Sequence, residues 1–383
     1  MGEAVDLKDP AVSQARLPFT DRSGRVTLRT IAELSGVHVS TVSRVLSPTP
    51  QPGARAASTA TSDRIKALAS ELGYVPNPHA TGLRTQRSNL IGVLAPRMSD
   101  VVFALIYEGL EDAADERGLH TLATNSRDNP QQRREKTEML LARRVEGLII
   151  GDATSDAGVV DELDRRGVPF VLVSRHAGGH PSVTCDDYLG GRLAAEHLLE
   201  LGHEQPGVIA GEPYASTGID RTAGFVDRYA EAGLAIKDER VTHSHFDVEG
   251  GREAATELLR TGGRPTAIFA VNDFAAIGAM GALREAGMHP GRDIALVGFN
   301  DVPLAAALPV PLTSVHSALN EMGRGAVELL ADRLAGQPTE SRRLAPRLVV
   351  RESSCPPPGS RSRRTSNKRA TPLAIADATT GAA

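Results

Sequence analysis

A cluster of short polar side chains and one arginine near residue 40 has the chemistry of a DNA contact surface. Hydroxyl and guanidinium groups bind phosphate oxygens and the polar edges of bases. We expect Val39, Ser40 and Arg44 to read bases, with the arginine binding guanine through two hydrogen bonds. Thr41 and Ser43 are expected to contact phosphates instead. These side chains can act together only if one helix presents them.

The segment that must position them is residues 26–46, VTLRTIAELSGVHVSTVSRVL. Its apolar positions predict two short helices joined by a tight turn, with Thr27 as the N-cap of the first. Gly36 would end that helix, because glycine adopts the left-handed conformation most easily. Ala32 lies four residues before this glycine and Val42 six residues after it, which is helix-turn-helix spacing. An ordinary αα-hairpin is the alternative, and the polar face of the second helix favours DNA binding.

Beyond residue 89, short apolar segments alternate with amphipathic segments. The expected strands are residues 90–96, 120–125, 145–151, 169–174, 182–187, 206–211, 240–245, 266–273, 293–301, 313–318 and 347–353. The expected helices are residues 102–117, 131–144, 159–166, 189–201, 222–232, 248–260, 274–286 and 319–335. Such alternation predicts an α/β fold with two doubly wound parallel sheets. The ligand cleft would lie between them, at the carboxyl ends of the strands.

Composition and charge agree with a globular regulator of two or three domains. The 383 residues are 40% hydrophobic and 23% charged, and the net charge is −4. Residues 21–87 nevertheless carry nine Lys or Arg against four Asp or Glu, so a basic head precedes an acidic body. The sequence has no apolar run near twenty residues and no apolar signal-peptide core at its start, which predicts a cytoplasmic protein. The two cysteines, Cys185 and Cys355, argue against a disulfide framework.

Two blocks of sequence resemble a known family. TLRTIAELSGVHVSTVSRVL, followed by ELGYVPNPHATGLRTQRSNLIGVL, is similar to the headpiece and hinge of the lactose/galactose-repressor family of bacterial transcription regulators, and the match continues to about Glu352. The resemblance implies an all-α helix-turn-helix headpiece and a two-lobed, periplasmic-binding-protein-like body with discontinuous lobes. The expected organisation is a disordered extension at 1–25, a headpiece at 26–75, a hinge at 76–88, an effector-binding and dimerisation domain at 89–355, and a disordered tail at 356–383.

The resemblance also implies how the hinge contacts DNA. In the family this segment is a helix that orders on operator DNA, where a paired leucine, matched here by Leu83, wedges between base pairs of the minor groove. Pro78 and Gly82 are weak helix formers, and the loop at 47–62 is longer than the family usually has. The predicted DNA-binding residues are Thr27, Val39, Ser40, Thr41, Ser43, Arg44, Asn77, Ala80 and Leu83.

Polar residues just after strands are the candidates for effector binding. Matches to the family are Phe103, Asn125, Arg175, Asp186, Arg221, Asp273 and Phe299, with Asp100, Asn272 and Asn300 as further candidates. The two arginines would bind ligand oxygens, Asp273 would accept hydrogen bonds and Phe103 would stack. A loop cap accounts equally well for each residue alone, but together they favour a small polar metabolite, sugar-like or nucleobase-like. Because only 3% of residues are aromatic, we expect stacking to be sparse.

Two other classes of protein fit parts of the pattern. A periplasmic solute-binding protein would share the body, but the headpiece and the lack of a signal peptide argue against it. Groups that an enzyme or metal site would need occur only as pairs: Cys185 beside Asp186, His197 with His203, and His243 with His245. No phosphate loop or glycine fingerprint follows the first strand, so we expect no cofactor, no metal and no catalysis. The predicted protein is a dimeric repressor that binds operator DNA and a small effector, without a membrane partner.

Overall fold

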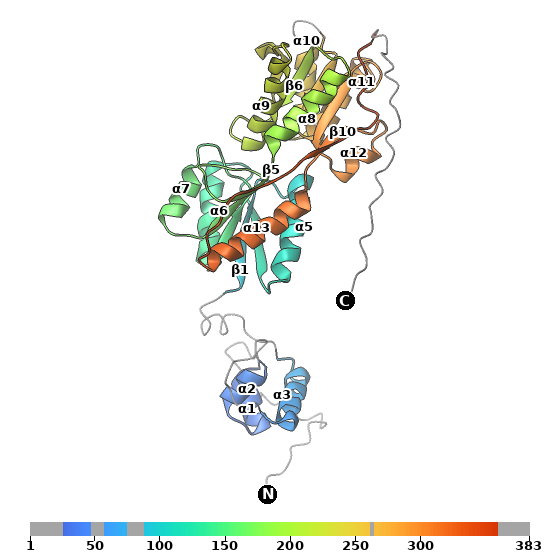
Figure 1. Ribbon diagram of the computed structural model, residues 1–383. Coiled ribbons are helices and arrows are strands. Elements are labelled where there is room, and N and C mark those ends of the chain that lie inside the picture. Colours follow the sequence, from blue (N-terminus) through green and yellow to red (C-terminus); the bar gives the residue numbers. More distant parts are fainter. Residues whose placement is uncertain (1–25, 47–56, 75–87, 261–263, 359–383) are drawn as a thin grey trace, which may run out of the picture. The chain divides into compact units, whose positions relative to one another are not determined.

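The computed structural model describes residues 26–46, 57–74, 88–260 and 264–358. The chain divides into two compact units, Met1–Ser88 and Asn89–Ala383 (Figure 1).

The described part of the first unit contains three helices: α1 (Leu28–Ser35), α2 (Val39–Val45) and α3 (Thr59–Glu71). Thr27 caps α1 by accepting a hydrogen bond from the backbone N–H of Thr30 (3.3 Å), as the sequence predicted. Gly36 ends α1 with φ 64°, the left-handed conformation that glycine adopts easily. The buried centre of the unit is formed by Ile31, Val42 and Ile65. The predicted helix-turn-helix is therefore confirmed, with Val42 closing the angle between its helices.

The second unit contains two six-stranded sheets, each the centre of one lobe. The sheet of the first lobe has the order β11-β5-β4-β3-β1-β2. Its strands are β1 (Leu90–Ala95), β2 (His120–Asn125), β3 (Gly147–Ile150), β4 (Phe170–Val173), β5 (Ser182–Cys185) and β11 (Arg342–Leu344). Its helices are α5 (Val101–Asp115), α6 (Pro130–Ala142), α7 (Gly158–Arg165) and α13 (Leu319–Leu334). All of its strand pairs are parallel.

The sheet of the second lobe has the order β12-β10-β9-β8-β6-β7. Its strands are β6 (Pro206–Ala210), β7 (Val241–His243), β8 (Ala267–Ala270), β9 (Ala295–Asn300), β10 (Thr313–His316) and β12 (Arg347–Val349). Its helices are α8 (Asp187–Glu200), α9 (Ser216–Glu231), α10 (Val248–Arg260), α11 (Asp273–Glu285) and α12 (Pro303–Ala307), with a 3-10 turn, η2 (Asp238–Arg240). Only the pair of β10 with β12 is antiparallel among the described strands of this sheet.

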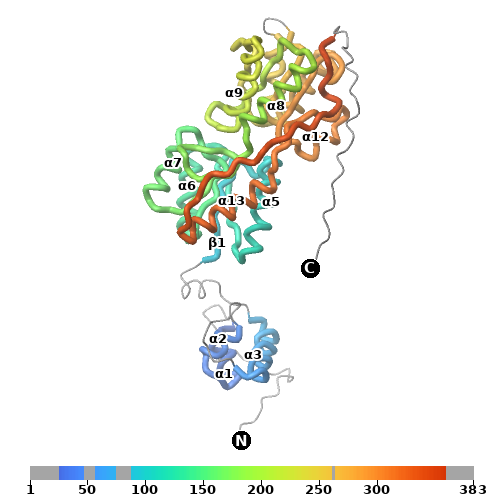
Figure 2. The backbone as a smooth tube through the Cα atoms, viewed as in Figure 1, coloured from blue at the N-terminus to red at the C-terminus, as the bar shows by residue number. Residues whose placement is uncertain are grey.

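The chain passes between the lobes three times. It leaves the first lobe after β5, returns after β10, and crosses again between β11 and β12. Figure 2 shows the last crossing as a red tube that runs from one lobe to the other. The expectation of discontinuous lobes is confirmed.

Helices cover both faces of each sheet. Alternate residues of a strand point to opposite sides, and the apolar residues on each side pack against the helices of that face. In the first lobe, Val93 belongs to the buried cluster with α5 and α13, which lie side by side in Figure 1. Its neighbour Leu94 belongs to the cluster with α6 and α7. In the second lobe, Phe269 packs with α8 and α9, and Ile268 packs with α10 and α11. The doubly wound α/β prediction is confirmed.

The structure differs from the expected elements at three places, and the first of them affects the cleft. Helix α9 begins at Ser216, six residues before the predicted start at residue 222, so Arg221 lies within a helix and not in a loop. The short helix α12 and the strand β11 were not predicted. The three-residue strand β11 gains its regular conformation by pairing with β5, a distant segment of the chain.

Candidate functional site

Helix α2 presents most of the predicted DNA-contacting side chains at its surface. Val39 is 39% exposed, and Ser40 and Arg44 are exposed, whereas Thr41 and Ser43 are half-buried. The Nε of Arg44 donates to the carbonyl oxygen of Ser40 (3.0 Å), and Nη2 donates to Oγ1 of Thr41 (3.4 Å). These contacts hold the guanidinium along the helix at the surface.

Two caps orient this surface, and one of them was not foreseen. Thr27 uses its hydroxyl in the cap of α1, and its backbone N–H donates to Oγ1 of Thr30 (3.1 Å). His38 caps α2, where its Nδ1 accepts from the backbone N–H of Ser40 (3.2 Å). The N-cap role of His38 was not predicted, because histidine is not among the usual capping residues. The predicted hinge contacts Asn77, Ala80 and Leu83 lie outside the described residues.

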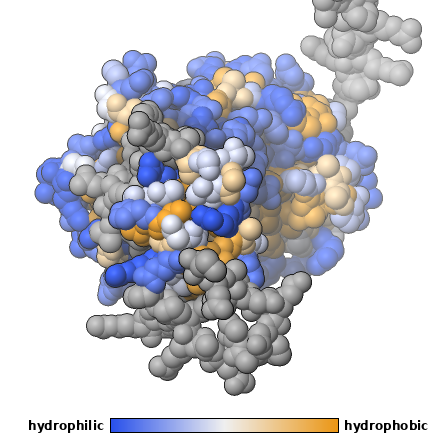
Figure 3. All heavy atoms as spheres, turned by 90° about the horizontal axis from the view of Figure 1, so that it is seen from below, coloured by the Kyte–Doolittle hydropathy of each residue, from blue (hydrophilic) through white to orange (hydrophobic). Residues whose placement is uncertain are grey.

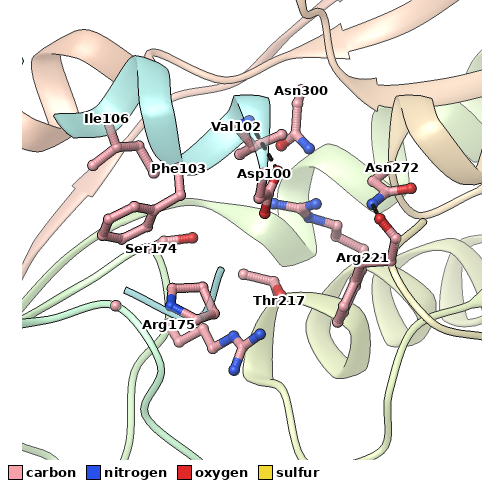
Figure 4. A pocket seen from close by; sticks show the side chains of 13 residues that line it. Asp100, Val102, Phe103, Ile106, Ser174, Arg175, Thr217, Arg221, Asn272 and Asn300 are labelled. Carbon is pink, nitrogen blue, oxygen red and sulfur yellow. Dashed lines mark hydrogen bonds between the residues drawn. The ribbon is translucent and has the colours of Figure 1, made fainter. Parts of the chain in front are cut away.

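Two adjoining cavities open at the carboxyl ends of the strands in the second unit. The inner cavity has a volume of about 50 Å³ and the outer cavity about 360 Å³. Both are lined by Pro96, Asp100, Arg175 and Phe246, so they form one cleft. The inner cavity is lined by residues of both lobes: Pro96, Asp100, Val102, Phe103, Ile106, Gly151, Ser174 and Arg175 from the first, and Thr217, Arg221, Phe246, Asn272 and Asn300 from the second (Figure 4). A ligand in this position would contact both lobes.

Three of the seven predicted effector residues line the inner cavity: Phe103, Arg175 and Arg221. All three further candidates, Asp100, Asn272 and Asn300, also line it. Figure 4 shows that these side chains come to the cavity from different elements of the two lobes. The expectation that polar residues after parallel strands face the cleft therefore identified six of the residues that line the inner cavity.

The other four predicted effector residues do not line either cavity. Asp186 caps α8 by accepting from the backbone N–H of Leu189 (3.0 Å), and Asn125 lies at the end of β2, away from both cavities. Asp273 is fully buried. Its carboxylate accepts hydrogen bonds from the Ser314 hydroxyl (2.6 Å) and from the backbone N–H of Val302 (2.8 Å), so it does not face the cleft. Phe299 is also fully buried, beneath the guanidinium of Arg221. We leave these four residues out of the proposed pocket.

Burial of Asp273 predicts a pH-dependent stability. Burial raises the pKa of its carboxyl from 3.8 to about 7, so the folded protein holds the proton more tightly than the unfolded chain. Stability is therefore lost as the pH rises from about 4 to about 7, by up to about 1.4 kcal/mol per pH unit, and the penalty is constant above that range. In Asp273→Asn this contribution is absent, so the melting temperature should fall less between pH 5.5 and pH 8 than in the wild type. Equal falls in both proteins would contradict the assignment.

Arg175, after β4, is held by an acid from a neighbouring loop. Its Nη1 and Nη2 donate to the two carboxylate oxygens of Asp128 (2.7 and 3.2 Å). The guanidinium also lies 5.8 Å from the ring centre of Tyr214 and 5.9 Å from that of Phe246. Behind this pair, Arg133 donates to buried Asp152 (2.8 Å), which also accepts from Ser126. The arginine is therefore fixed in place before any ligand arrives.

Arg221, on α9, is held in the same way within the second lobe. Its Nε donates to Asp187 (2.7 Å), its Nη1 donates to the carbonyl oxygen of Val271 (2.8 Å), and its guanidinium lies 3.8 Å from the ring centre of Phe299. Burial raises the pKa of Asp187 to about 6, although the adjacent guanidinium opposes this shift. Asp187 is therefore ionised at neutral pH and forms a buried ion pair with Arg221.

The cleft is richer in aromatic side chains than we expected from the composition. Phe103 lines the inner cavity, Tyr214 and Phe274 line the outer cavity, and Phe246 lines both. Four of the thirteen Phe and Tyr residues of the chain line the two cavities, so the low aromatic content still leaves several ring surfaces in the cleft. A rule based on polar residues could not find Tyr214 and Phe246, which follow β6 and β7 in loops.

Hydrogen bonds join the two lobes beside the cleft. His176 of the first lobe makes two contacts with α9 of the second lobe. The backbone N–H of His176 donates to Oγ of Ser216 (2.9 Å), and the side-chain Nε2 of His176 lies 2.7 Å from Oδ2 of Asp220. The hydrogen bond to Asp220 raises the pKa of His176. The backbone N–H of Ser155 also donates to the carbonyl oxygen of Tyr214 (2.9 Å). The lobes are thus in direct contact without a ligand.

Comparison with known proteins identifies the family. Residues 27–77 match the model for bacterial regulatory proteins of the lacI family, and residues 195–354 match the periplasmic binding protein-like domain. The HTH-type transcriptional regulator CelR of Thermobifida fusca is 32% identical, over 87% of this chain and 99% of its own length. The chain belongs to the lacI family. The HTH-type transcriptional repressor PurR of Photobacterium profundum, another relative of this lacI-family chain, is 29% identical over 85% of this chain and 98% of its own length.

Solved structures related to this lacI-family chain share its fold. The lac repressor dimer bound to operator and the anti-inducer ONPF is 28% identical with a TM-score of 0.79, and the match covers 86% of this chain and 99% of that one. The complex of the regulator CelR with cellobiose is 31% identical with a TM-score of 0.66, and the match covers 86% of this chain and all of that one. This lacI-family chain is a DNA-binding transcriptional regulator with a periplasmic-binding-protein-like, effector-binding body.

Membrane-spanning helices and metal-binding clusters are both absent from the described residues. No helix there is long and apolar enough to cross a membrane. In the same part of the chain, no three His, Cys, Asp or Glu side chains are grouped so that they could hold a metal ion.

Proposed function

We propose that this protein is a repressor that binds a near-palindromic operator as a homodimer, and that a small polar metabolite in the cleft sets its affinity for DNA. The observation that carries the proposal is that one chain combines an exposed polar helix, α2, with a cavity lined by both lobes of a binding body. Val39, Ser40 and Arg44 would read bases, and Thr41 and Ser43 would contact phosphates. Bacterial operator DNA lies in the cytoplasm, so we propose that the protein acts there, as a regulator and not as an enzyme.

Dimerisation follows from the limited reading surface of one headpiece. A seven-residue helix presents few base-reading side chains, so high specificity needs two half-sites. Large apolar side chains also remain exposed on the body, including Tyr188, Leu189 and Ile219. On the face in Figure 3, apolar atoms lie among hydrophilic ones. Exposed apolar side chains on two helices that pack together, α8 and α9, favour contact with another protein surface.

Residues 76–88 would link the headpiece, 26–75, to the effector-binding and dimerisation domain, 89–355. We propose that Asn77, Ala80 and Leu83 contact the minor groove, with Leu83 as the wedge between base pairs. Unstacking a base step costs roughly a few kcal/mol, which the contacts made by kinked DNA offset. Leu83 lies seven residues before β1, so a change in the first lobe would be transmitted to it over a short stretch of chain.

Control by an effector requires different affinities for two arrangements of the lobes. A ligand that touches Arg175 in the first lobe and Arg221 in the second would favour one arrangement over the other. Typical couplings of this kind are about 1–3 kcal/mol. The cleft side chains can bind a sugar-like or a nucleobase-like ligand, and the relative solved with cellobiose makes a sugar the first class to test.

The proposal predicts specific, salt-dependent DNA binding. We expect the full-length protein to protect a near-palindromic sequence in DNA upstream of its own gene, and its affinity to fall steeply with salt as bound counterions are released. A thermal-shift screen of neutral sugars and nucleobases should then identify ligands, and each one that binds should change operator affinity. Equal affinity for that upstream DNA and for random DNA would contradict the proposal, as would turnover of a bound metabolite.

A further inference from the structure

The guanidinium groups at the cleft are already neutralised by carboxylates of the protein. Arg175 is paired through two hydrogen bonds with Asp128, and Arg221 is paired with Asp187. The side chains of both pairs are largely buried, with at most 13% of any of them exposed. An anionic ligand at either arginine would have to share one guanidinium with a buried carboxylate.

The rest of the cleft wall provides no excess of positive charge. Carboxylates of the outer cavity outnumber its two arginines, Arg97 and Arg175: they are Asp100, Asp128, Glu212, Asp247 and Glu249. Glu212 contacts His245, and Glu249 is paired with Arg252, so these two acids have cationic or polar partners. The three remaining carboxylates, those of Asp100, Asp128 and Asp247, still outnumber the two arginines of the outer cavity. Burial also raises the pKa of Asp100, which indicates a weakly solvated site.

These pairs favour a ligand that both donates and accepts hydrogen bonds. A phosphate or carboxylate group is negatively charged near neutral pH, its oxygens are mainly acceptors, and it would repel Asp100 and Asp128. A hydroxyl group can accept from Arg175 and donate to Asp128, so both members of the pair stay hydrogen-bonded. Buried charges that keep their partners in this way avoid the large cost of desolvation.

The size and the lining of the cleft place a second condition on the ligand, which concerns its shape. The outer cavity of about 360 Å³ lies in the range of small-molecule sites, and the inner cavity extends it. Phe103, Tyr214, Phe246 and Phe274 supply flat apolar surfaces along it. Such surfaces suit the faces of a ring.

We propose that the effector is an uncharged ring compound that both donates and accepts hydrogen bonds, and that the Arg175–Asp128 and Arg221–Asp187 pairs exclude phosphorylated and carboxylated compounds. This inference rests on the proposed function, because it concerns the effector of the same cleft. It excludes sugar phosphates, nucleotides and sugar acids.

The test converts the cleft into an anion site and uses inorganic phosphate as the probe. In Asp128→Asn, Arg175 loses its carboxylate partner while asparagine still suits the left-handed backbone at this position (φ 53°). The melting temperature of the full-length protein is measured in phosphate and in chloride at equal pH and ionic strength. We expect the variant to gain a phosphate-dependent stabilisation over the wild type, corresponding to at least about tenfold tighter phosphate binding.

The matched control is Glu138→Gln, which removes a carboxylate paired with Arg166 on the exposed side of α6, outside both cavities. It should respond to phosphate as the wild type does, since phosphate bound by the headpiece contributes equally to all three proteins. If Asp128→Asn does not fold, Asp187→Asn serves instead, because it removes the carboxylate partner of Arg221, which lines the inner cavity. A variant and wild type that respond alike would overturn the inference, as would an equal gain in Glu138→Gln.

A second result separates this inference from the proposed function. A phosphorylated or carboxylated ligand that binds the wild-type cleft and changes operator affinity would overturn the inference and support the proposed function. Failure to bind a specific operator would overturn the proposed function, while the phosphate experiment would still decide whether the cleft excludes anions.

Discussion

Replacing Arg44 with alanine is expected to weaken operator binding by roughly 1–3 kcal/mol per half-site, or at least about thirtyfold for a dimer that uses two half-sites. Arg44 lies exposed on α2, where its Nε hydrogen bond to the carbonyl oxygen of Ser40 leads the guanidinium along the helix surface. A guanidinium can donate two hydrogen bonds to guanine in the major groove, and no shorter side chain at this position replaces them. The measurement is the affinity for operator and for random DNA at one salt concentration.

The comparison of the two DNAs decides what Arg44 does. If it reads a base, affinity for the operator falls much more than affinity for random DNA. An equal loss on both would mean that it contacts only the backbone, and the proposed reading residues would then have to be reassigned. Arg29→Ala is the control, because Arg29 is an exposed arginine on α1, near Glu33, and outside the proposed reading helix. It should change affinity for both DNAs by the same small factor.

The elements that sequence predicted well are those determined by local interactions. Thr27 and Gly36 act within a few residues of their own position, as a cap and a left-handed turn, and Val42 packs between two helices that are adjacent in sequence. The strands and helices of the body were predicted from apolar spacing, which is also local. The start of α9 was missed because residues 215–218 contain no side-chain cap and two weak helix formers, Thr217 and Gly218. Contacts with α8 and the loop after β4 stabilise this turn.

The cleft residues that sequence misjudged depend on distant parts of the chain. Asp273 follows a strand, as the cleft residues do, but Val302 and Ser314 take both of its oxygens. Those partners lie 29 and 41 residues away, so no local pattern could reveal them. Asp128, which pairs with Arg175 across 47 residues, was missed for the same reason. Sequence therefore located the edge of the sheets where the proposed effector cleft lies, but not which polar groups remain available there.

Replacing Arg221 with methionine is expected to destabilise the second lobe by about 3–5 kcal/mol, because it leaves the carboxylate of Asp187 buried without its partner. Both side chains are almost completely buried, with 6% and 2% exposed. The deficit should be smaller at low pH, where protonation removes the charge of Asp187. The control is Arg228→Met, also on α9, whose ion pair with Glu196 is more exposed, so its loss should destabilise the protein much less.

The double variant Asp187→Asn with Arg221→Met tests the reason for this loss. If the isolated carboxylate causes the loss of stability, removing its charge as well should recover much of that stability. The losses in the two single variants then come from one shared interaction, so they should not add. Additive losses would show that packing of Arg221 on Phe299 and its hydrogen bond to Val271 dominate instead. The effector response gives a separate measurement. Because Arg221 also lines the inner cavity, a double variant that regains stability should still respond weakly to the effector, whereas a full response would mean that Arg221 only supports the wall of the cleft.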